Sequence, residues 1–267
     1  MAMNDASNRQ EKILCALGFS FKRGGAHTAR TIMLDELSKL FPYVGQADAP
    51  KSAYEKAIIG DNCLGKRSGK TRALTFHHLV DLYALNPSVA LFRTMRFFWQ
   101  RDAAGQPLIA LLCAYARDSV LRSASSFILS TAEGATVSRK SVETQIDDHE
   151  PGRFSEITLK STAQNIDSSF TKSGHLTGRV KKIRTLAIPT AGSVAYALFL
   201  GYLAGERGQA LFNSEYVKLL DCSAERAMEL AEVASRKGWI VFKRIGSVVE
   251  VLFPKLIPQE ETENLHE

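Results

Sequence analysis

Residues 212–254 read FNSEYVKLLDCSAERAMELAEVASRKGWIVFKRIGSVVEVLFP, and this stretch decides the fold of the C-terminal part of the chain. It predicts a short helix over residues 214–220, a turn at residues 221–222 and a second helix over residues 223–237. Gly238 ends that helix, because glycine readily adopts positive φ. Two runs rich in β-branched and aromatic residues follow, separated by Gly246 and Ser247, and predict a β-hairpin. This order of elements indicates a winged helix-turn-helix.

Most winged helices bind DNA, but the charges of this one are balanced. Residues 212–257 carry seven basic and six acidic side chains. Affinity for duplex DNA comes largely from neutralised phosphates, which this many carboxylates oppose. Two hypotheses therefore stay open: the module contacts DNA with Lys243 and Arg244 of its wing, or it holds a protein partner instead.

The composition is that of a cytoplasmic globular protein. A chain of 267 residues with 45% hydrophobic side chains can form two domains with cores. Its four cysteines show no metal-binding spacing, which predicts neither a disulfide framework nor a metal site. The apolar run 187–204 contains Pro189 and two glycines, so we interpret it as a buried first helix of the winged-helix unit and expect no membrane span.

Positive charge is concentrated in two segments. The net charge is +6, residues 51–101 hold nine basic and three acidic side chains, and residues 151–185 hold seven and two. The tail from residue 258 adds four glutamates. Two separate basic segments indicate a surface for a polyanion. The alternative for each segment is an ordinary solvated face.

The first basic segment contains GKRSGKT at residues 65–71. A phosphate-binding loop needs four residues between its first glycine and the Gly-Lys pair, and here there are three. We therefore predict no nucleotide or other cofactor, and no motif for catalysis is present elsewhere. The cations of this segment are interpreted as phosphate contacts at the start of a helix: Lys66, Arg67, Lys70 and Arg72.

The second basic segment follows a predicted long helix over residues 106–131 and a short helix that begins near Arg139 and Lys140. A further helix over residues 155–174 places Leu159, Ala163 and Ile166 on one buried stripe with Phe170. Asparagine and glutamine pair with adenine edges, and lysine and serine reach phosphates. The opposite face of this helix is thus suited to a major groove, and it carries Lys160, Ser161, Gln164, Asn165, Ser168 and Lys172.

A turn at residues 177–178 and a run of cations come next, and the run predicts a small wing along a DNA backbone: Arg179, Lys181, Lys182 and Arg184. The alternative for the whole segment is a polar, solvent-facing helix beside a basic linker. The predicted fold is mainly α, a helical bundle with a helix-turn-helix-like middle segment and a C-terminal winged helix with a short β-hairpin. Its predicted parts are residues 1–105, 106–185, 186–257 and an acidic tail, 258–267.

Three runs resemble the BrxA-like family of the BREX bacteriophage-exclusion systems: DNCLGKRSGKTRALTFHHLVDLYAL, QPLIALLCAYARDSVLR and FSEITLKSTAQNIDSSFTKSGHLTGRVKKIR. The resemblance covers roughly residues 55–185. It implies a mainly helical, cytoplasmic DNA-binding protein with no assigned catalytic residues, which works beside a methyltransferase and other defence proteins. The chain differs from the family's pattern in its length and in its C-terminal winged helix.

The function expected from the sequence is non-enzymatic binding of double-stranded DNA within a phage-defence assembly. Three other functions remain open: an adaptor that docks a partner protein through its winged helix, an RNA-binding protein and a winged-helix transcription regulator. The sequence predicts no oligomeric state.

Overall fold

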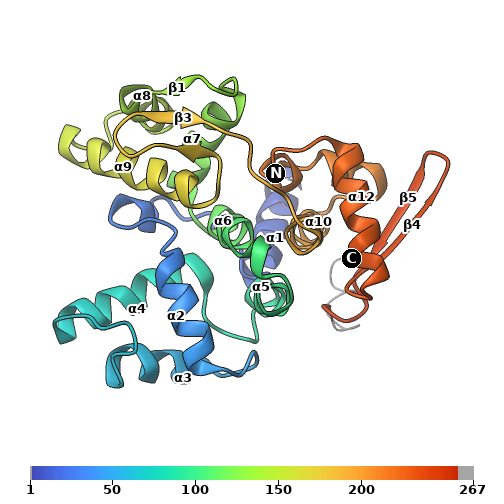
Figure 1. Cartoon of the computed structure of the whole chain (residues 1–267), viewed down its shortest axis with the longest axis horizontal. Coiled ribbons are helices and arrows are strands. Elements are labelled where there is room, and N and C mark those ends of the chain that lie inside the picture. The colour runs from blue at the N-terminus through green and yellow to red at the C-terminus, as the bar shows by residue number, and fades with distance from the viewer. Residues whose placement is uncertain (1, 258–267) are drawn as a thin grey trace. The chain divides into compact units, whose positions relative to one another are not determined.

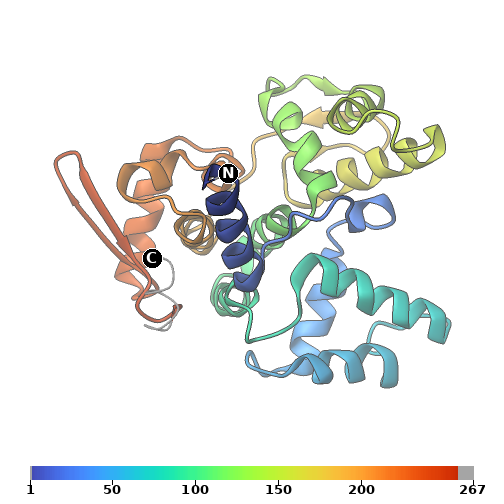
Figure 2. The same ribbon diagram turned by 180° about the vertical axis from the view of Figure 1, so that it is seen from behind.

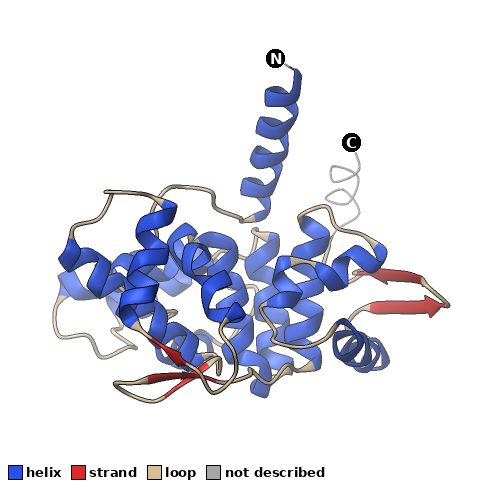
Figure 3. Ribbon diagram, turned by 90° about the horizontal axis from the view of Figure 1, so that it is seen from above, coloured by secondary structure: helices blue, strands red, loops and turns tan. Residues whose placement is uncertain are grey.

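The computed structural model describes residues 2–257 and confirms the mainly helical fold, with strands confined to two small sheets (Figure 3). The chain divides into two compact units. Unit 1 lies within Met1–Phe19, Val89–Leu112 and Ile188–Glu267, and unit 2 comprises Ser20–Ser88 and Cys113–Ala187. The predicted acidic tail, 258–267, lies outside the described residues.

These units do not follow the predicted division of the chain. Only the predicted boundary at residue 186 agrees with a boundary between units, which falls after Ala187. The boundary expected at residue 105 is replaced by one after Leu112, inside helix α6 (Gln106–Arg117). The N-terminal region is thus shared between the two units rather than forming a domain of its own.

Unit 1 contains the predicted C-terminal winged helix (Figures 1 and 2). Gly238 ends its second long helix with φ +68°, and Gly246 opens the hairpin turn with φ +59°, both as the sequence predicts. Its elements are α1 (Ala2–Leu17), α5 (Ala90–Arg101), η3 (Ala103–Gly105), α10 (Ala191–Leu203), η4 (Gly208–Asn213), α11 (Glu215–Lys218), α12 (Ala224–Arg236), β4 (Val241–Ile245) and β5 (Val248–Leu252).

The core of unit 1 surrounds α10, whose residues are all buried. The Tyr196 hydroxyl donates to the Leu91 carbonyl of α5 at 3.1 Å, and Phe199 packs against Phe253 with ring centroids 5.4 Å apart. The helix is apolar because protein covers it on every side. No helix within residues 2–257 combines the length and the apolar character needed to cross a membrane.

Unit 2 combines a group of helices from residues 20–88 with a second winged helix from residues 113–187 (Figure 1). Besides the end of α6, its elements are η1 (Ala26–Thr28), α2 (Leu34–Val44), α3 (Lys51–Glu55), η2 (Lys56–Gly60), α4 (Gly69–Tyr83), α7 (Ser119–Ser130), β1 (Thr136–Val137), α8 (Arg139–His149), α9 (Glu156–Lys172), β2 (Leu176–Thr177) and β3 (Lys182–Arg184).

The order α7-β1-α8-α9-β2-β3 is that of a winged helix-turn-helix with a three-stranded sheet. The sheet order is β1-β3-β2 and both pairings are antiparallel, with Thr136 opposite Ile183 and Leu176 opposite Arg184. The residues between β2 and β3 form the wing, and α9 takes the place of the recognition helix. The sequence predicted a helix-turn-helix-like segment followed by a small wing here, but not β1.

The predicted long helix over residues 106–131 is wrong, because the chain breaks at Asp118 into α6 and α7. The Asp118 carboxylate accepts the N–H groups of Val120 at 3.0 Å and Leu121 at 3.1 Å and so caps the N-terminus of α7. A capping aspartate starts a new helix, since it satisfies N–H groups that have no partner within the helix.

Candidate nucleic-acid interface

The outward face of α9 is an uncovered stripe of side chains in unit 2. Ile157, Ser161, Gln164 and Ser168 follow one another at spacings of four, three and four, which places them in one line along a helix. Ile157 is 83% exposed, and Lys160 and Gln164 are exposed. The predicted inner stripe lies opposite, with Ala163, Ile166 and Phe170 fully buried. The helix thus presents the polar face expected from its sequence.

The wing beside α9 carries two exposed cations. Gly178 has φ +91°, and a Cβ there would lie 2.1 Å from the Lys181 carbonyl oxygen, so only glycine fits this turn. Arg179, Val180 and Lys181 are exposed at the tip. Across residues 2–257, no hydrogen bond or ion pair engages the side chains of Lys160, Gln164, Arg179 or Lys181. These four side chains are available to a ligand.

Lys182 supports the wing from inside. Its Nζ donates to the Thr171 hydroxyl at 2.9 Å and to the Gly178 carbonyl at 2.7 Å, so the lysine joins the wing to the end of α9. We predicted from the sequence that Lys182 contacts a phosphate. In the structure its Nζ already donates to two protein oxygens, so Lys182 is a weaker candidate for that contact than Arg179 or Lys181.

Arg184 does not lie along a DNA backbone, and that part of the prediction is wrong. The residue is 1% exposed, and its guanidinium donates to the carbonyls of His175, at 3.2 Å, and Thr185. Its place in β3, paired with β2 on one side and near β1 on the other, turns this cation inward. Arg184 stabilises the sheet rather than the ligand.

Asn165 and Lys172 also have partners within unit 2. The Asn165 amide donates to the His27 carbonyl at 2.9 Å. This side chain was predicted to contact a base edge, but it joins α9 to η1 instead. Lys172 forms an ion pair with Asp35 of α2. Four of the six side chains predicted for this face therefore remain as candidates: Lys160, Ser161, Gln164 and Ser168.

The two cations at the start of α8 share one carboxylate. Arg139 lies 3.0 Å and Lys140 lies 3.4 Å from Glu143, so the positive charge of this turn is partly neutralised. Both side chains remain on the surface beside the winged helix. They are weaker candidates for phosphate contacts than Arg179 and Lys181.

The first basic segment surrounds the start of α4, where Ser68 caps the helix. Lys66 pairs with Glu36 at 3.0 Å, and Arg72 donates to the Ile59 carbonyl at 2.7 Å. Arg67 and Lys70 are exposed. Half of this predicted set is therefore used to join α4 to its neighbours, and half faces solvent.

The C-terminal winged helix of unit 1 pairs three of its cations, Arg226, Arg236 and Lys243, with its own carboxylates. On α12, Arg226 lies 2.7 Å from Glu229 and Arg236 lies 3.8 Å from Glu232. On the wing, Lys243 lies 3.2 Å from Glu250, and Arg244 donates to the Gly246 carbonyl at 3.4 Å. This arrangement favours a partner other than a polyanion for the C-terminal module.

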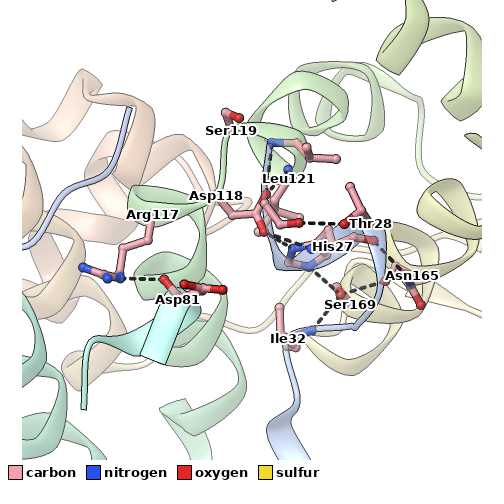
Figure 4. Close-up of polar contacts among 12 residues, drawn as sticks. His27, Thr28, Ile32, Asp81, Arg117, Asp118, Ser119, Leu121, Asn165 and Ser169 are labelled. Atoms are coloured by element: carbon pink, nitrogen blue, oxygen red, sulfur yellow. Dashed lines mark hydrogen bonds and ion pairs between the residues drawn. The ribbon is translucent and has the colours of Figure 1, made fainter. Parts of the chain in front are cut away.

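A buried polar network holds α9 in place, and the sequence did not reveal it (Figure 4). The His27 imidazole, on η1, lies between Asp118, 2.9 Å from its Nδ1, and Ser169 of α9, 2.9 Å from its Nε2. The His27 backbone N–H also donates to Asp118 at 3.1 Å. One residue therefore ties the start of α7 to the last turn of α9.

The Ser169 hydroxyl of this network is placed as a structural group and not as a nucleophile. Ser169 accepts the N–H of Ile32 at 3.0 Å, and its single hydroxyl hydrogen has two acceptors within reach, the Asn165 carbonyl at 2.8 Å and His27 Nε2 at 2.9 Å. Both His27 and Ser169 are 0% exposed, so no substrate reaches the hydroxyl. The arrangement has the residue types of a Ser-His-Asp hydrolase, but it is a structural support.

Two buried carboxylates have opposite pKa shifts. Burial raises the pKa of Asp118, but the adjacent His27 and the N–H donors outweigh burial, and the resulting pKa lies below the ordinary value. Since an ionised Asp118 can only accept, His27 Nδ1 carries a hydrogen. On α9, burial raises the pKa of Asp167 to about 6, although Lys182 and Arg139 lower it.

A signal for Asp118 was present in the sequence. An aspartate followed by serine within a long apolar run is a start signal for a helix, and it divides residues 106–131 where the structure does. No such signal marks His27, because its partners lie 91 and 142 residues further along the chain. The search among curated proteins found no match, and no family model matches the chain.

Proposed function

We propose that this protein binds double-stranded DNA through the winged helix of unit 2, with α9 in the major groove and the wing along the phosphates. The observation that carries the proposal is the set of exposed side chains on α9, Ile157, Lys160 and Gln164, beside a wing with exposed cations. Recognition helices of helix-turn-helix proteins enter the major groove and contact base edges with their N-terminal residues. At 17 residues, α9 is long enough to follow the groove.

Cations from three elements contact phosphates in this proposal. Arg179 and Lys181 contact phosphates from the wing, and Lys160 does so from the edge of α9, because these side chains hold no protein acceptor. Arg67 and Lys70 add contacts from the start of α4. Each phosphate contact contributes to affinity without reading sequence. The buried Ser169 supports the further proposal that the function is binding rather than catalysis.

The biological setting rests on the resemblance of residues 55–185 to the BrxA-like family. It extends the proposal to a DNA-binding component of a phage-defence assembly in the cytoplasm. An operon that also encodes a methyltransferase and an ATPase would support that setting, and an isolated gene beside the promoter it controls would favour a transcription regulator.

A salt titration of duplex binding tests the proposal. The variant Lys160→Ala/Arg179→Ala/Lys181→Ala removes three cations from unit 2, and the control Arg226→Ala/Arg236→Ala/Lys243→Ala removes three from the C-terminal module. We expect the first variant to bind at least about tenfold more weakly and to flatten the salt slope by about one unit per cation. The control should bind like the wild type.

Three results would contradict the proposal: equal affinities for the two variants, no binding of duplex DNA by the wild type, or displacement of DNA by a small excess of RNA of the same sequence. The last result would favour the RNA-binding alternative. Thermal unfolding of both variants checks that the six substituted surface residues leave the fold intact.

A second candidate function, protein docking, is favoured by the C-terminal wing. Lys243 of this wing pairs with Glu250, and the hairpin exposes two apolar side chains, Ile245 at 82% and Val248 at 70%. These two residues face each other across the β-ribbon. If the wing docks a partner, Ile245→Ser/Val248→Ser in the full chain abolishes its co-purification and leaves DNA affinity unchanged. If the partner still co-purifies with the double variant, the wing is not the docking surface.

A further inference from the structure

The most exposed apolar side chain of α9 is also in the part of the helix that would contact bases. Ile157 lies in the first turn and is 83% exposed. Burying an isoleucine stabilises a protein by roughly 1.5–3 kcal/mol, and this position forgoes that gain. An isoleucine exposed at the start of α9, with Lys160 and Gln164 exposed further along the helix, suggests an apolar contact with a ligand.

The contacts around α9 fix the direction in which this side chain points. Ser155 caps the helix by accepting the Thr158 N–H at 3.3 Å, and Asn165 and Ser169 hold one flank against η1. The fully buried Phe170 belongs to the opposite side. These contacts fix the rotation of α9 about its own axis, so Ile157 and the residues in line with it face away from the core of unit 2.

The major groove offers one apolar group at its base edges, the C5 methyl of thymine, and glutamine pairs with adenine through N6 and N7. Ile157 and Gln164 lie on the same line, seven residues apart. At a rise of about 1.5 Å per residue they are roughly 10.5 Å apart, or about three steps of 3.4 Å along a duplex. Ser161, between them, pairs with several bases and discriminates little.

We propose that Ile157 and Gln164 make this protein selective for A·T base pairs, with Ile157 against a thymine methyl and Gln164 on an adenine, up to about three base pairs apart. The proposal rests on the binding of duplex DNA by unit 2. It assigns specificity to two side chains that carry no charge, and it separates them from the cations that provide affinity.

Uracil in place of thymine tests the role of Ile157, because it removes the C5 methyl and leaves the base pair unchanged. A duplex enriched by selection with the wild-type protein is synthesised with thymine or with uracil at each position in turn. We expect one position at which uracil weakens wild-type binding about three- to fivefold, as the loss of one apolar carbon does. Ile157→Ala should bind both duplexes equally, and Ile157→Val should retain the difference.

Gln164→Ala should reduce the preference for A·T over G·C at a second position by at least about fivefold. Gln209→Ala, at an exposed glutamine of η4 in unit 1, is the matched control and should keep both preferences. All four variants should unfold at the wild-type temperature, since their side chains lie on the surface, and should keep the wild-type salt slope.

The outcomes separate this inference from the proposed function. If duplex binding is salt-dependent but uracil has no effect, or if its effect persists in Ile157→Ala, the assignment to Ile157 is wrong and the proposed function stands. Selection of G·C-rich duplexes by the wild type would likewise overturn it. Absence of any duplex binding would overturn both.

Discussion

At the scale of single residues, neighbours in sequence have unrelated roles because one helix faces both solvent and the core. Gln164 points outward from α9, and Asn165, one position later, donates to the His27 carbonyl. A rotation of about 100° per residue separates the two amides. The chemistry of a side chain therefore does not decide whether it is free to contact a ligand; its position around the helix does.

His27 is predicted to contribute strongly to the stability of unit 2. His27→Ala removes the imidazole that links the Asp118 carboxylate to the Ser169 hydroxyl and creates a buried cavity, which should lower the free energy of unfolding by about 2–4 kcal/mol. Urea denaturation measures this difference. His77→Ala, at a side chain 71% exposed, is the control and should change it by less than about 0.5 kcal/mol. Equal effects would mean that the network does not hold the unit.

Asp167 is predicted to make stability fall as the pH rises. Its pKa is 3.8 in the unfolded chain and about 6 in the folded protein, so the folded state binds the proton more tightly. The free energy of unfolding should therefore decrease between about pH 4 and pH 6 and stay reduced above that range. Asp118 acts in the opposite direction, because its lowered pKa contributes stability that is lost only as the pH falls further.

The variant Asp167→Asn cannot ionise, so it should be more stable than the wild type above pH 6 and should lack the decrease below it. Thermal unfolding across this pH range measures the effect, and Asp148→Asn, at an exposed aspartate of α8, controls for the loss of one charge. Parallel curves for the wild type and Asp167→Asn would show that Asp167 does not titrate in this range.

At the scale of elements, the wing of unit 2 depends on one glycine. A β-carbon at Gly178 would overlap the Lys181 carbonyl, whereas a β-carbon at Gly246, in the other hairpin, meets no atom within 4 Å. Both glycines have positive φ, so alanine strains both turns, but only Gly178→Ala must also open its turn.

Gly178→Ala is therefore predicted to weaken duplex binding about as much as removal of Arg179 and Lys181, roughly ten- to a hundredfold if each contributes about 1 kcal/mol or more. Gly246→Ala should leave affinity unchanged and lower the unfolding temperature only slightly. Anisotropy titrations with one labelled duplex compare the two. Weaker binding by Gly246→Ala instead would assign the DNA contact to unit 1.

The elements that the sequence predicted well are those defined by local pattern. The buried stripe of α9, the end of α12 at Gly238 and the turn at Gly246 all follow from periodicity or from backbone freedom at a single residue. The break at Asp118 was missed because the apolar pattern continues across it. The burial of Arg184 was missed because a run of cations does not show which of them turns inward, here to the carbonyls of His175 and Thr185.

At the scale of the whole molecule, each unit is assembled from segments far apart in sequence. The C-terminal winged helix reads as a separate domain because its helices and hairpin are consecutive. Yet the core of this winged helix also needs α5. Phe98 of α5 packs against Trp239 with ring centroids 6.0 Å apart, and Asp102, just after α5, accepts the N–H of Gly192 in α10 at 2.7 Å. No local pattern in residues 188–257 announces a need for residues 89–112.

We therefore predict that a fragment containing only residues 188–267 does not fold cooperatively. Loss of α5 exposes one side of the fully buried α10, and an apolar helix face in water favours aggregation over a native core. A fusion of residues 89–112 to residues 188–267 through a flexible linker restores α5 and should recover a helical circular dichroism spectrum with a single thermal transition. Replacing Phe98 and Leu91 by serine in the fusion should abolish that recovery, because the restored helix then lacks the side chains that face α10. A cooperative transition in the short fragment would instead show that the winged helix is a domain by itself, as its sequence suggests.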